Sequence, residues 1–465
     1  MLNILTERAI IMDYISCNDK RFWADSDAQT IQNAIDFAKS EHIHEVVIPH
    51  RNERTGEEIW NIDQNIVLPS SMTVILADAY LRAADDQAIH VFCTEFSEEE
   101  LHDIRILGIG EATVDGGKWT RDNRPEYYFE NDPENWPDGS DYDLIFFYNV
   151  RNFEVGNICI TNAKHYSTCF TFCRFGRIHD IHFRNYATVE NQDGVDLRYG
   201  CEYITVENIT GVTGDDTVAL NAIDEKETTR PRVTNKSIDI HDITIRNIIA
   251  STHGSSLVRL LNTDGAKLYN VTIENIKDTG KTISICAVFF GTPGATWARV
   301  RQHTQDEFYN ITIRDVTTCA SLGIRFGEPC RDVLVENIHT YGMCEVPLQF
   351  SHPFTCQNFT LRNAYLRSDK PFRAGIAVLC DKEKLENFRM EQVYLGKSEH
   401  VFAVQDLPIS DFTYEEPVQG YMADEFDKSQ LPFYGRYFKH SLGKVIQRRA
   451  PENRYGGTTP PEADF

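Results

Sequence analysis

The sequence predicts an all-β solenoid, in which short strands stack coil upon coil around one core. Three observations support this fold class: a repeated apolar frame with strand spacing, a repeat length in the twenties, and one amphipathic helix near the N-terminus. The chain has 465 residues, of which 41% are hydrophobic and 25% charged, as is usual for a globular protein. Because this length fits one large domain or two to three ordinary ones, the repeat has to decide the organisation.

The repeat is a frame of apolar residues at positions i, i+2 and i+5. It begins at Phe153, Ile181, Ile204, Ile243, Val271, Ile311, Val333, Phe359 and Phe388. The i to i+2 alternation places two side chains on one face of a strand, and an Asn or Asp before i+5 permits a bend. Most steps are 22 to 29 residues, and two are 39 and 40. Stacked units of this kind share a continuous core that one unit cannot form alone.

Other repeat architectures fit less well. Leucine-rich repeats have similar periods but need a Leu-dense pattern, and β-propeller blades need four strands in about 40 residues. An earlier frame at Ile104, and the segments 46–49 and 74–76, extend the predicted solenoid towards the N-terminus.

The two ends of the chain lack the repeat. Residues 26–39 place Ile31, Ala34, Ile35 and Ala38 at helical spacing behind Ser26, which is a typical N-cap residue. Such a helix would cover the open end of the solenoid. We therefore expect an N-terminal extension over 1–25, the capped solenoid over 26–405, and a C-terminal extension over 406–465 that packs on the solenoid or is partly disordered.

Charge and cysteine usage restrict the partners and the compartment. A net charge of −24 and a pI near 5.0 argue against nucleic acid as a partner. No apolar run is long enough to span a bilayer, and residues 1–16 carry no export signal. The 12 cysteines are scattered, which favours free thiols and a cytoplasmic location. The sequence leaves the oligomeric state open.

A column of polar residues carries the predicted chemistry. Asp193, the pair Asp215 and Asp216, and His253 lie at nearly equal offsets, of 10 to 12 residues, from the starts of three successive frames. Equal offsets stack on one face of a solenoid, with neighbouring strands about 4.8 Å apart. Inverting glycoside hydrolysis needs one protonated and one ionised carboxyl group, roughly 6.5–9.5 Å apart, and crowded like charges raise the pKa of one of them. Adjacent residues point oppositely in a strand, so Asp215 and Asp216 share a face only if the chain bends near Gly214.

Several motifs resemble glycoside hydrolase family 28, the polygalacturonase and rhamnogalacturonase group. Asn191–Asp196 (Asn-Gln-Asp-Gly-Val-Asp) resembles the family's Asn-Thr-Asp motif. Gly214–Ala219 resembles its Gly-Asp-Asp-Cys-Ile-Ala, and Thr252–Gly254 resembles its Gly-His-Gly. Upstream, Gly108–Gly110 and Asp115–Trp119 resemble its Gly-x-Gly and Asp-Gly-x-Gly-x-x-Trp stretch. The similarity runs from about residue 28 to 392.

This resemblance implies a right-handed parallel β-helix and an inverting hydrolase of pectin-type or related oligosaccharides. It implies Asp215 as the general acid, Asp193 and Asp216 as the pair that activates water, and His253 as a polar support of the acid. Asn191 would orient the carboxylates or bind sugar. No metal or cofactor is expected.

The sequence departs from the family at its substrate-carboxylate motif, Arg-x-Lys. That motif should fall near Ser284–Cys286, where there is no cation. Arg325 matches the Arg in a partial version one coil later, and Arg259 is a second candidate for substrate binding. Trp297 would stack on a sugar ring or pack under its own loop. The excursions 127–137, 224–236 and 292–306 are candidates for cleft walls, and a walled cleft would make the enzyme exo-acting.

Two other functions remain open on the sequence. One is a β-helical polysaccharide lyase, in which aspartates bind calcium and an arginine removes a proton next to a carboxylate. The other is a non-catalytic, glycan-binding β-helix whose aspartates are structural.

Overall fold

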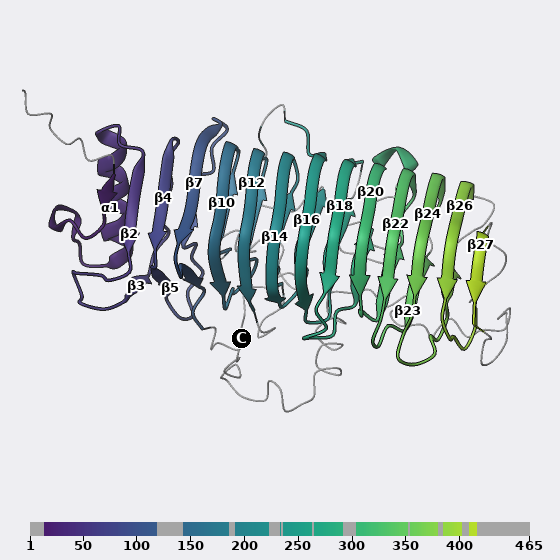
Figure 1. Ribbon diagram of the computed structural model, residues 1–465. Helices are drawn as coiled ribbons and strands as arrows, with labels where there is room; N and C mark the ends of the chain where they lie inside the picture. Colours follow the sequence, from purple (N-terminus) through teal and green to yellow (C-terminus); the bar gives the residue numbers. More distant parts are fainter. Residues whose placement is uncertain are drawn as a thin grey trace, which may run out of the picture.

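The computed structural model describes residues 14–118, 143–185, 191–222, 233, 236–262, 265–291, 304–351, 354–379, 385–401 and 409–415. Its strands stack side by side along one axis, from purple at the N-terminal end to yellow-green at the other (Figure 1). The predicted β-solenoid is confirmed as a parallel β-helix, because the ladders between the strands of successive coils are parallel. Among the described residues, no helix has the length and apolar character needed to cross a membrane.

The strands form a seventeen-stranded sheet, the long sheet, and a ten-stranded sheet, the short sheet. The long sheet contains β1 (Ile15–Ser16), β2 (Glu45–Pro49), β3 (Ile59–Ile62), β4 (Met72–Ala77), β5 (Tyr80–Ala83), β7 (Leu101–Ile109), β8 (Thr113–Asp115), β10 (Val150–Thr161), β12 (Arg174–Arg184), β14 (Glu202–Thr213), β16 (Ile240–Thr252), β18 (Leu268–Asp278), β20 (Phe308–Thr318), β22 (Cys330–Thr340), β24 (Cys356–Leu366), β26 (Leu385–Leu395) and β27 (Ile409–Tyr414). The short sheet contains β6 (Phe92–Cys93), β9 (Ile145–Tyr148), β11 (Thr168–Thr171), β13 (Val195–Arg198), β15 (Val218–Ala222), β17 (Ser256–Asn262), β19 (Cys286–Phe290), β21 (Leu322–Phe326), β23 (Val346–Ser351) and β25 (Ile376–Leu379).

The helix α1 (Asp27–Ser40) forms where the sequence predicts it and lies at the N-terminal end of the stack (Figure 1). Ser26 is its N-cap, and the Ser26 hydroxyl accepts a hydrogen bond of 3.2 Å from Gln29 N. The four predicted apolar residues of α1 are fully buried. Two 3-10 turns cover Lys20–Phe22 and Gln305–Glu307. The strands β1 and β27, which belong to the predicted extensions, pair with β2 and β26.

Each long strand bends in the middle, as the repeat predicts. The bend residue is usually Asn or Asp in the left-handed region, with a φ of 57° at Asn208 and 58° at Asn247. These residue types tolerate that conformation better than other non-glycine residues. The two apolar residues before the bend and the one after it point inwards and are buried. One frame and its bend thus make two sides of a coil, and the short sheet makes the third.

One predicted frame is out of phase. Ile181 pairs with Ile158 and Ile209, which are third positions of their frames, so it is not a frame start. The first inward position of β12 is Gly176, which pairs with Phe153 and Ile204. A Cβ at Gly176 would lie 2.1 Å from the Phe153 ring, so that ring fills the place of the missing side chain. An apolar pattern cannot detect a frame that begins with glycine.

A ladder of alternating charges lies on the outer face of the long sheet. Seven residues in successive register form it: Glu207, Arg246, Glu274, Arg314, Glu336, Arg362 and Glu391. Arg246 pairs with Glu207 at 2.6 Å and Arg362 with Glu336 at 2.7 Å, while Arg314 pairs with Glu274. The arginines of these pairs are exposed, and each pair contributes little alone, but a shift of register would separate the opposite charges.

We expect Arg314→Glu to lower the melting temperature more than Arg314→Gln, because it places three acidic residues side by side. The difference should correspond to about 1 kcal/mol and shrink at high salt. Thermal unfolding at two salt concentrations measures it. Arg389→Glu is the control, since Arg389 is exposed and pairs in register with Thr360. An equal loss in the control would remove the ladder as a source of stability.

Candidate active site

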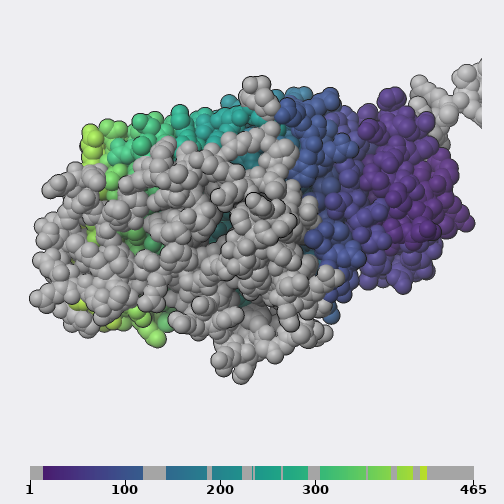
Figure 2. All heavy atoms as spheres, turned by 180° about the vertical axis from the view of Figure 1, so that it is seen from behind, coloured from purple at the N-terminus to yellow at the C-terminus, as the bar shows by residue number. Residues whose placement is uncertain are grey.

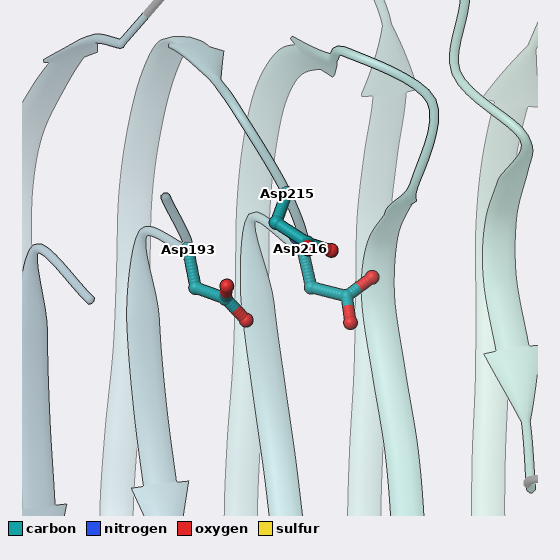
Figure 3. Close-up of side chains that lie close together, drawn as sticks. All are labelled: Asp193, Asp215 and Asp216. Atoms are coloured by element: carbon teal, nitrogen blue, oxygen red, sulfur yellow. The ribbon is translucent and has the colours of Figure 1, made fainter. Parts of the chain in front are cut away.

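The polar column predicted from the sequence lies at the corners where the chain leaves the long sheet and enters the short sheet. Asp193 precedes β13, Asp215 and Asp216 lie between β14 and β15, and His253 lies between β16 and β17. One carboxylate oxygen from each aspartate falls in a group whose members lie within 4.8 Å of one another. Figure 3 shows the three side chains next to each other at two neighbouring corners. This is closer than the spacing expected for inverting hydrolysis.

Asp193 and Asp216 lie side by side on neighbouring coils because β13 pairs with β15. Val195 pairs with Val218, and Gly194 N donates a hydrogen bond of 2.9 Å to the Asp216 carbonyl. Asp193 lies 17 residues after Gly176, whereas Asp216 lies 12 after Ile204. The five additional residues correspond to 186–190, which lie outside the described residues. The sequence-based offset of Asp193 was counted from Ile181, which lies five residues after Gly176. That error has the same size as the insertion, so the offsets of Asp193 and Asp216 agreed.

The two adjacent aspartates share a side because they stand in a corner and not in a strand. The strand β14 ends at Thr213, and the chain bends at Gly214 as required. Gly214 N and Asp215 N both donate to the Gln192 carbonyl, at 3.0 and 3.2 Å. The Asp215 carbonyl accepts hydrogen bonds from the hydroxyls of Thr213, at 2.8 Å, and Thr252, at 2.5 Å. The peptide between the two aspartates is thus held from two coils.

The three carboxyl groups differ in their surroundings. Asp193 and Asp216 are buried, whereas Asp215 is half-buried. Asp216 Oδ1 accepts hydrogen bonds from the Ser255 hydroxyl at 2.6 Å and from Ser256 N at 2.9 Å. Sequence reasoning missed these serines, because they are identified only by the pairing of β15 with β17. The site therefore contains one accessible carboxyl group beside two sheltered ones.

A fourth carboxyl group, Asp196, lies beside this cluster on β13. It is fully buried, and Asn221 Nδ2 donates a hydrogen bond of 2.5 Å to its Oδ1. Burial raises the pKa of Asp196 well above its usual range, and the carboxyl groups of Asp143, Asp215 and Asp216 add to this while Arg198 opposes it. The site thus contains a carboxyl group that favours its neutral form.

The other predicted site residues have different placements. His253 is buried, and its backbone N–H donates a hydrogen bond to the Thr213 carbonyl at 3.0 Å. Asn191 is buried, and its backbone is in the left-handed region, with a φ of 57°. Its side-chain amide nitrogen, Nδ2, has no hydrogen-bond partner among the described residues. Trp297 lies outside the described residues, as do 127–137 and most of 224–236 and 292–306. Their predicted roles remain predictions.

The structure brings the two candidate arginines together. Arg259 on β17, Phe289 on β19 and Arg325 on β21 occupy one register position of the short sheet. The guanidinium carbons of Arg259 and Arg325 lie 3.7 and 4.8 Å from the centre of the Phe289 ring, and both arginines are buried. Burial raises the pKa of Cys286 to about 12, and the charges of Arg325, Arg259 and Asp216 all act on that thiol. Two buried cations from alternate coils thus lie on the short sheet, in the coils that follow the carboxylate cluster.

The carboxylate cluster could hold a cation as well as perform proton transfer. Among the described residues, Asp193, Asp215 and Asp216 are the group of acidic side chains placed closely enough to share an ion. Carboxylate oxygens are ligands that Ca²⁺ prefers, although it takes six to eight of them. Three side chains would supply part of that set.

Another buried carboxyl group with a raised pKa, Asp278, lies at the end of β18. Burial raises its pKa to about 6, and polar groups of Gly280, Ser284, Cys319 and Thr318 oppose this rise. The Gly280 N to Asp278 Oδ1 distance is 3.0 Å, and the Tyr341 hydroxyl donates to the Asp278 carbonyl at 2.5 Å. Asp278 is fully buried and was not singled out by the sequence.

Comparisons with known proteins support the family resemblance over part of the chain. Residues 43–229 match the family described as glycosyl hydrolases family 28, which confirms the resemblance there. This stretch includes the three aspartates and ends before His253, Arg259 and Arg325. No curated protein compared with the chain matches it significantly.

Three solved structures are similar in fold. A mannuronan C-5 epimerase A-module from Azotobacter vinelandii is 11% identical, with a TM-score of 0.54, covering 87% of this chain and 100% of that chain. The tailspike protein of E. coli bacteriophage HK620, in complex with a pentasaccharide, is 12% identical, with a TM-score of 0.51 and coverage of 87% and 75%. A polygalacturonase from Erwinia carotovora ssp. carotovora is 12% identical, with a TM-score of 0.49 and coverage of 86% and 92%. At these identities the likeness concerns the fold alone.

We expect the stability of this protein to carry a pH dependence from Asp278. Its folded pKa, about 6, exceeds the usual value of 3.8, so its contribution to stability is fully present below about pH 4 and is lost as the pH rises through about 6. The change is roughly 3 kcal/mol. Melting temperatures of the wild type and Asp278→Asn between pH 4 and 7 measure it, with the exposed Asp63→Asn as control. Parallel curves for the wild type and Asp278→Asn would contradict the expectation.

Proposed function

We propose that this chain, a divergent relative of the glycosyl hydrolases family 28, hydrolyses O-glycosidic bonds in a pectin-type or related oligosaccharide. The observation that supports this most is the convergence of Asp193, Asp215 and Asp216 at neighbouring corners. Hydrolysis needs a carboxyl group that donates a proton and a carboxylate that activates water. One half-buried and two buried aspartates supply these different surroundings.

In the proposed mechanism Asp215 is the general acid and donates its proton to the glycosidic oxygen as the bond to the anomeric carbon breaks. Asp193 and Asp216 hold a water molecule and accept its proton, while the water oxygen bonds to the opposite face of the anomeric carbon. The hydrogen bonds from Ser255 and Ser256 keep Asp216 in place for this step. His253 supports Asp215, and Asn191 orients the carboxylates or binds sugar. The outcome would be inversion, with the nearest carboxylate oxygens closer together than the separation usual for inverting enzymes.

Arg259 and Arg325 favour an acidic sugar as part of the substrate. A guanidinium binds a carboxylate through two parallel hydrogen bonds, and two of them flank Phe289 on the short sheet. They would replace the missing Arg-x-Lys with cations from two coils. We further propose exo action on oligosaccharides, with Trp297 at a sugar-binding position, and a cytoplasmic location. The eleven described cysteines are free, which suits a reducing compartment.

A calcium-dependent lyase is the second candidate, and the close spacing of the three carboxylates favours it. A divalent cation bound among the three carboxylates would offset the repulsion between their negative charges, which lie within 4.8 Å of one another. Arg259 or Arg325, which are buried on the short sheet, would be the candidates for removing the proton next to a uronate carboxylate. The two candidates differ in their products.

We expect Asp215→Asn and Asp193→Asn each to lower turnover roughly 10²–10⁴-fold, because the acid or the water-activating group is lost. Release of reducing ends from a panel of pectic and neutral oligosaccharides measures this, and Asp63→Asn should retain the wild-type rate. Unchanged turnover in Asp215→Asn would show that catalysis is misassigned. Binding of an oligosaccharide without any turnover would favour a glycan-binding protein.

The product should be a saturated sugar whose anomeric configuration is inverted. Proton NMR of freshly formed product reads the configuration, and ultraviolet absorbance reads unsaturation. A chelator should leave the rate unchanged if the aspartates act by proton transfer. Retention of configuration would exclude the proposed roles of Asp193 and Asp216, and a chelator-sensitive rise in absorbance would identify a lyase.

A further inference from the structure

The Asp215 carbonyl is held unusually firmly for a group in a corner. It accepts the Thr213 hydroxyl at 2.8 Å and the Thr252 hydroxyl at 2.5 Å, and both threonines are fully buried. Thr213 belongs to the same coil as Asp215, whereas Thr252 belongs to the next one. Rotation of the peptide between Asp215 and Asp216 would break both hydrogen bonds and turn the two carboxyl groups relative to each other.

Thr252 stands where the resembled Gly-His-Gly motif has its first glycine, so this chain has added a side chain at that position. The added hydroxyl is the donor to Asp215. The Thr252 backbone is fixed in turn by the next coil: its N–H donates to the Ser284 hydroxyl at 3.2 Å, and its carbonyl accepts the Thr282 hydroxyl at 2.9 Å. The position of Thr252 therefore depends on Ser284 and Thr282.

Ser284 is buried beside this corner. A hydroxyl has one hydrogen to donate and two lone pairs that accept. One lone pair of the Ser284 hydroxyl accepts the Thr252 N–H. The chain of contacts runs from Ser284 through Thr252 to the Asp215 carbonyl.

We propose that Thr252 and Ser284 form a positioning relay that fixes the peptide between Asp215 and Asp216. The relay touches neither the substrate nor the reacting atoms, and it acts by keeping the two adjacent carboxyl groups on one side. Its importance for turnover rests on the proposed function, whereas the positional claim does not. A displacement of about 1 Å at such groups can slow a reaction roughly 100-fold.

The direct test compares Thr252→Val, which keeps the shape of the side chain and removes the hydroxyl, with Thr252→Ser, which keeps the hydroxyl. In crystal structures of both, we expect the Asp215 carbonyl to turn away in Thr252→Val, so that the three carboxylates no longer lie within 4.8 Å, and to stay in Thr252→Ser. Unmoved carboxylates in Thr252→Val overturn the proposal whatever the activity. If Thr252→Val does not fold, Ser284→Ala gives the same test one step further along the relay.

The kinetic test uses the oligosaccharide that the wild type turns over fastest. We expect kcat to fall roughly 10- to 100-fold in Thr252→Val with little change in KM, and to recover in Thr252→Ser. In Ser284→Ala, kcat should fall in the same direction as in Thr252→Val, because the acceptor of the Thr252 N–H is lost. Wild-type kcat in Ser284→Ala removes Ser284 from the relay. Normal turnover in Asp215→Asn would instead reject the proposed function and leave the crystallographic result standing.

Discussion

Parallel hydrogen bonding between successive coils is the constraint on which the rest of this structure depends. Because each strand pairs with its counterpart in the next coil, a residue's place in its coil fixes which neighbours its side chain meets along the whole molecule. Seen from behind, the colours run along the molecule in sequence order, from purple at one end to green and yellow at the other (Figure 2). A slip of one residue would turn an inward column outwards. The apolar columns and the alternating Arg and Glu ladder both penalise such a slip.

The same register assembles the site from residues far apart in sequence. Gly194 pairs with the Asp216 carbonyl and thereby sets Asp193 beside Asp216, although 22 residues separate the two aspartates. The pairing of β15 with β17 brings Ser255 and Ser256 to Asp216. Differences in coil length are absorbed at the corners and beyond them, so insertions leave the paired strands unchanged. A corner can therefore carry chemistry while the strands carry stability.

The sequence predicted features that depend on residues within one coil. It did not predict features that depend on a side chain from a neighbouring coil. Apolar spacing predicted the strands, and Asn or Asp predicted the bends, because these depend on residues within one coil. It failed at Gly176, whose inward space is filled by Phe153 from another coil. The stacking of Arg259 and Arg325 on Phe289 was equally hidden, since it follows from register alone. Asp278 escaped notice because nothing in its local sequence indicates burial.

The boundary of the family match has a physical counterpart in the molecule. The matched residues, 43–229, contain the three aspartates, whereas several of the groups that hold them lie in later coils. Thr252 and Ser284 hold the peptide between the adjacent aspartates, and Arg259 and Arg325 place positive charge on the following coils of the short sheet. Because successive coils contact each other through a fixed register, these later coils can change the position and the charge of the site without altering its carboxylates. Divergence there alters the surroundings of the carboxylates and keeps the carboxylates themselves, so the proposed hydrolysis can act on a different substrate from that of the relatives.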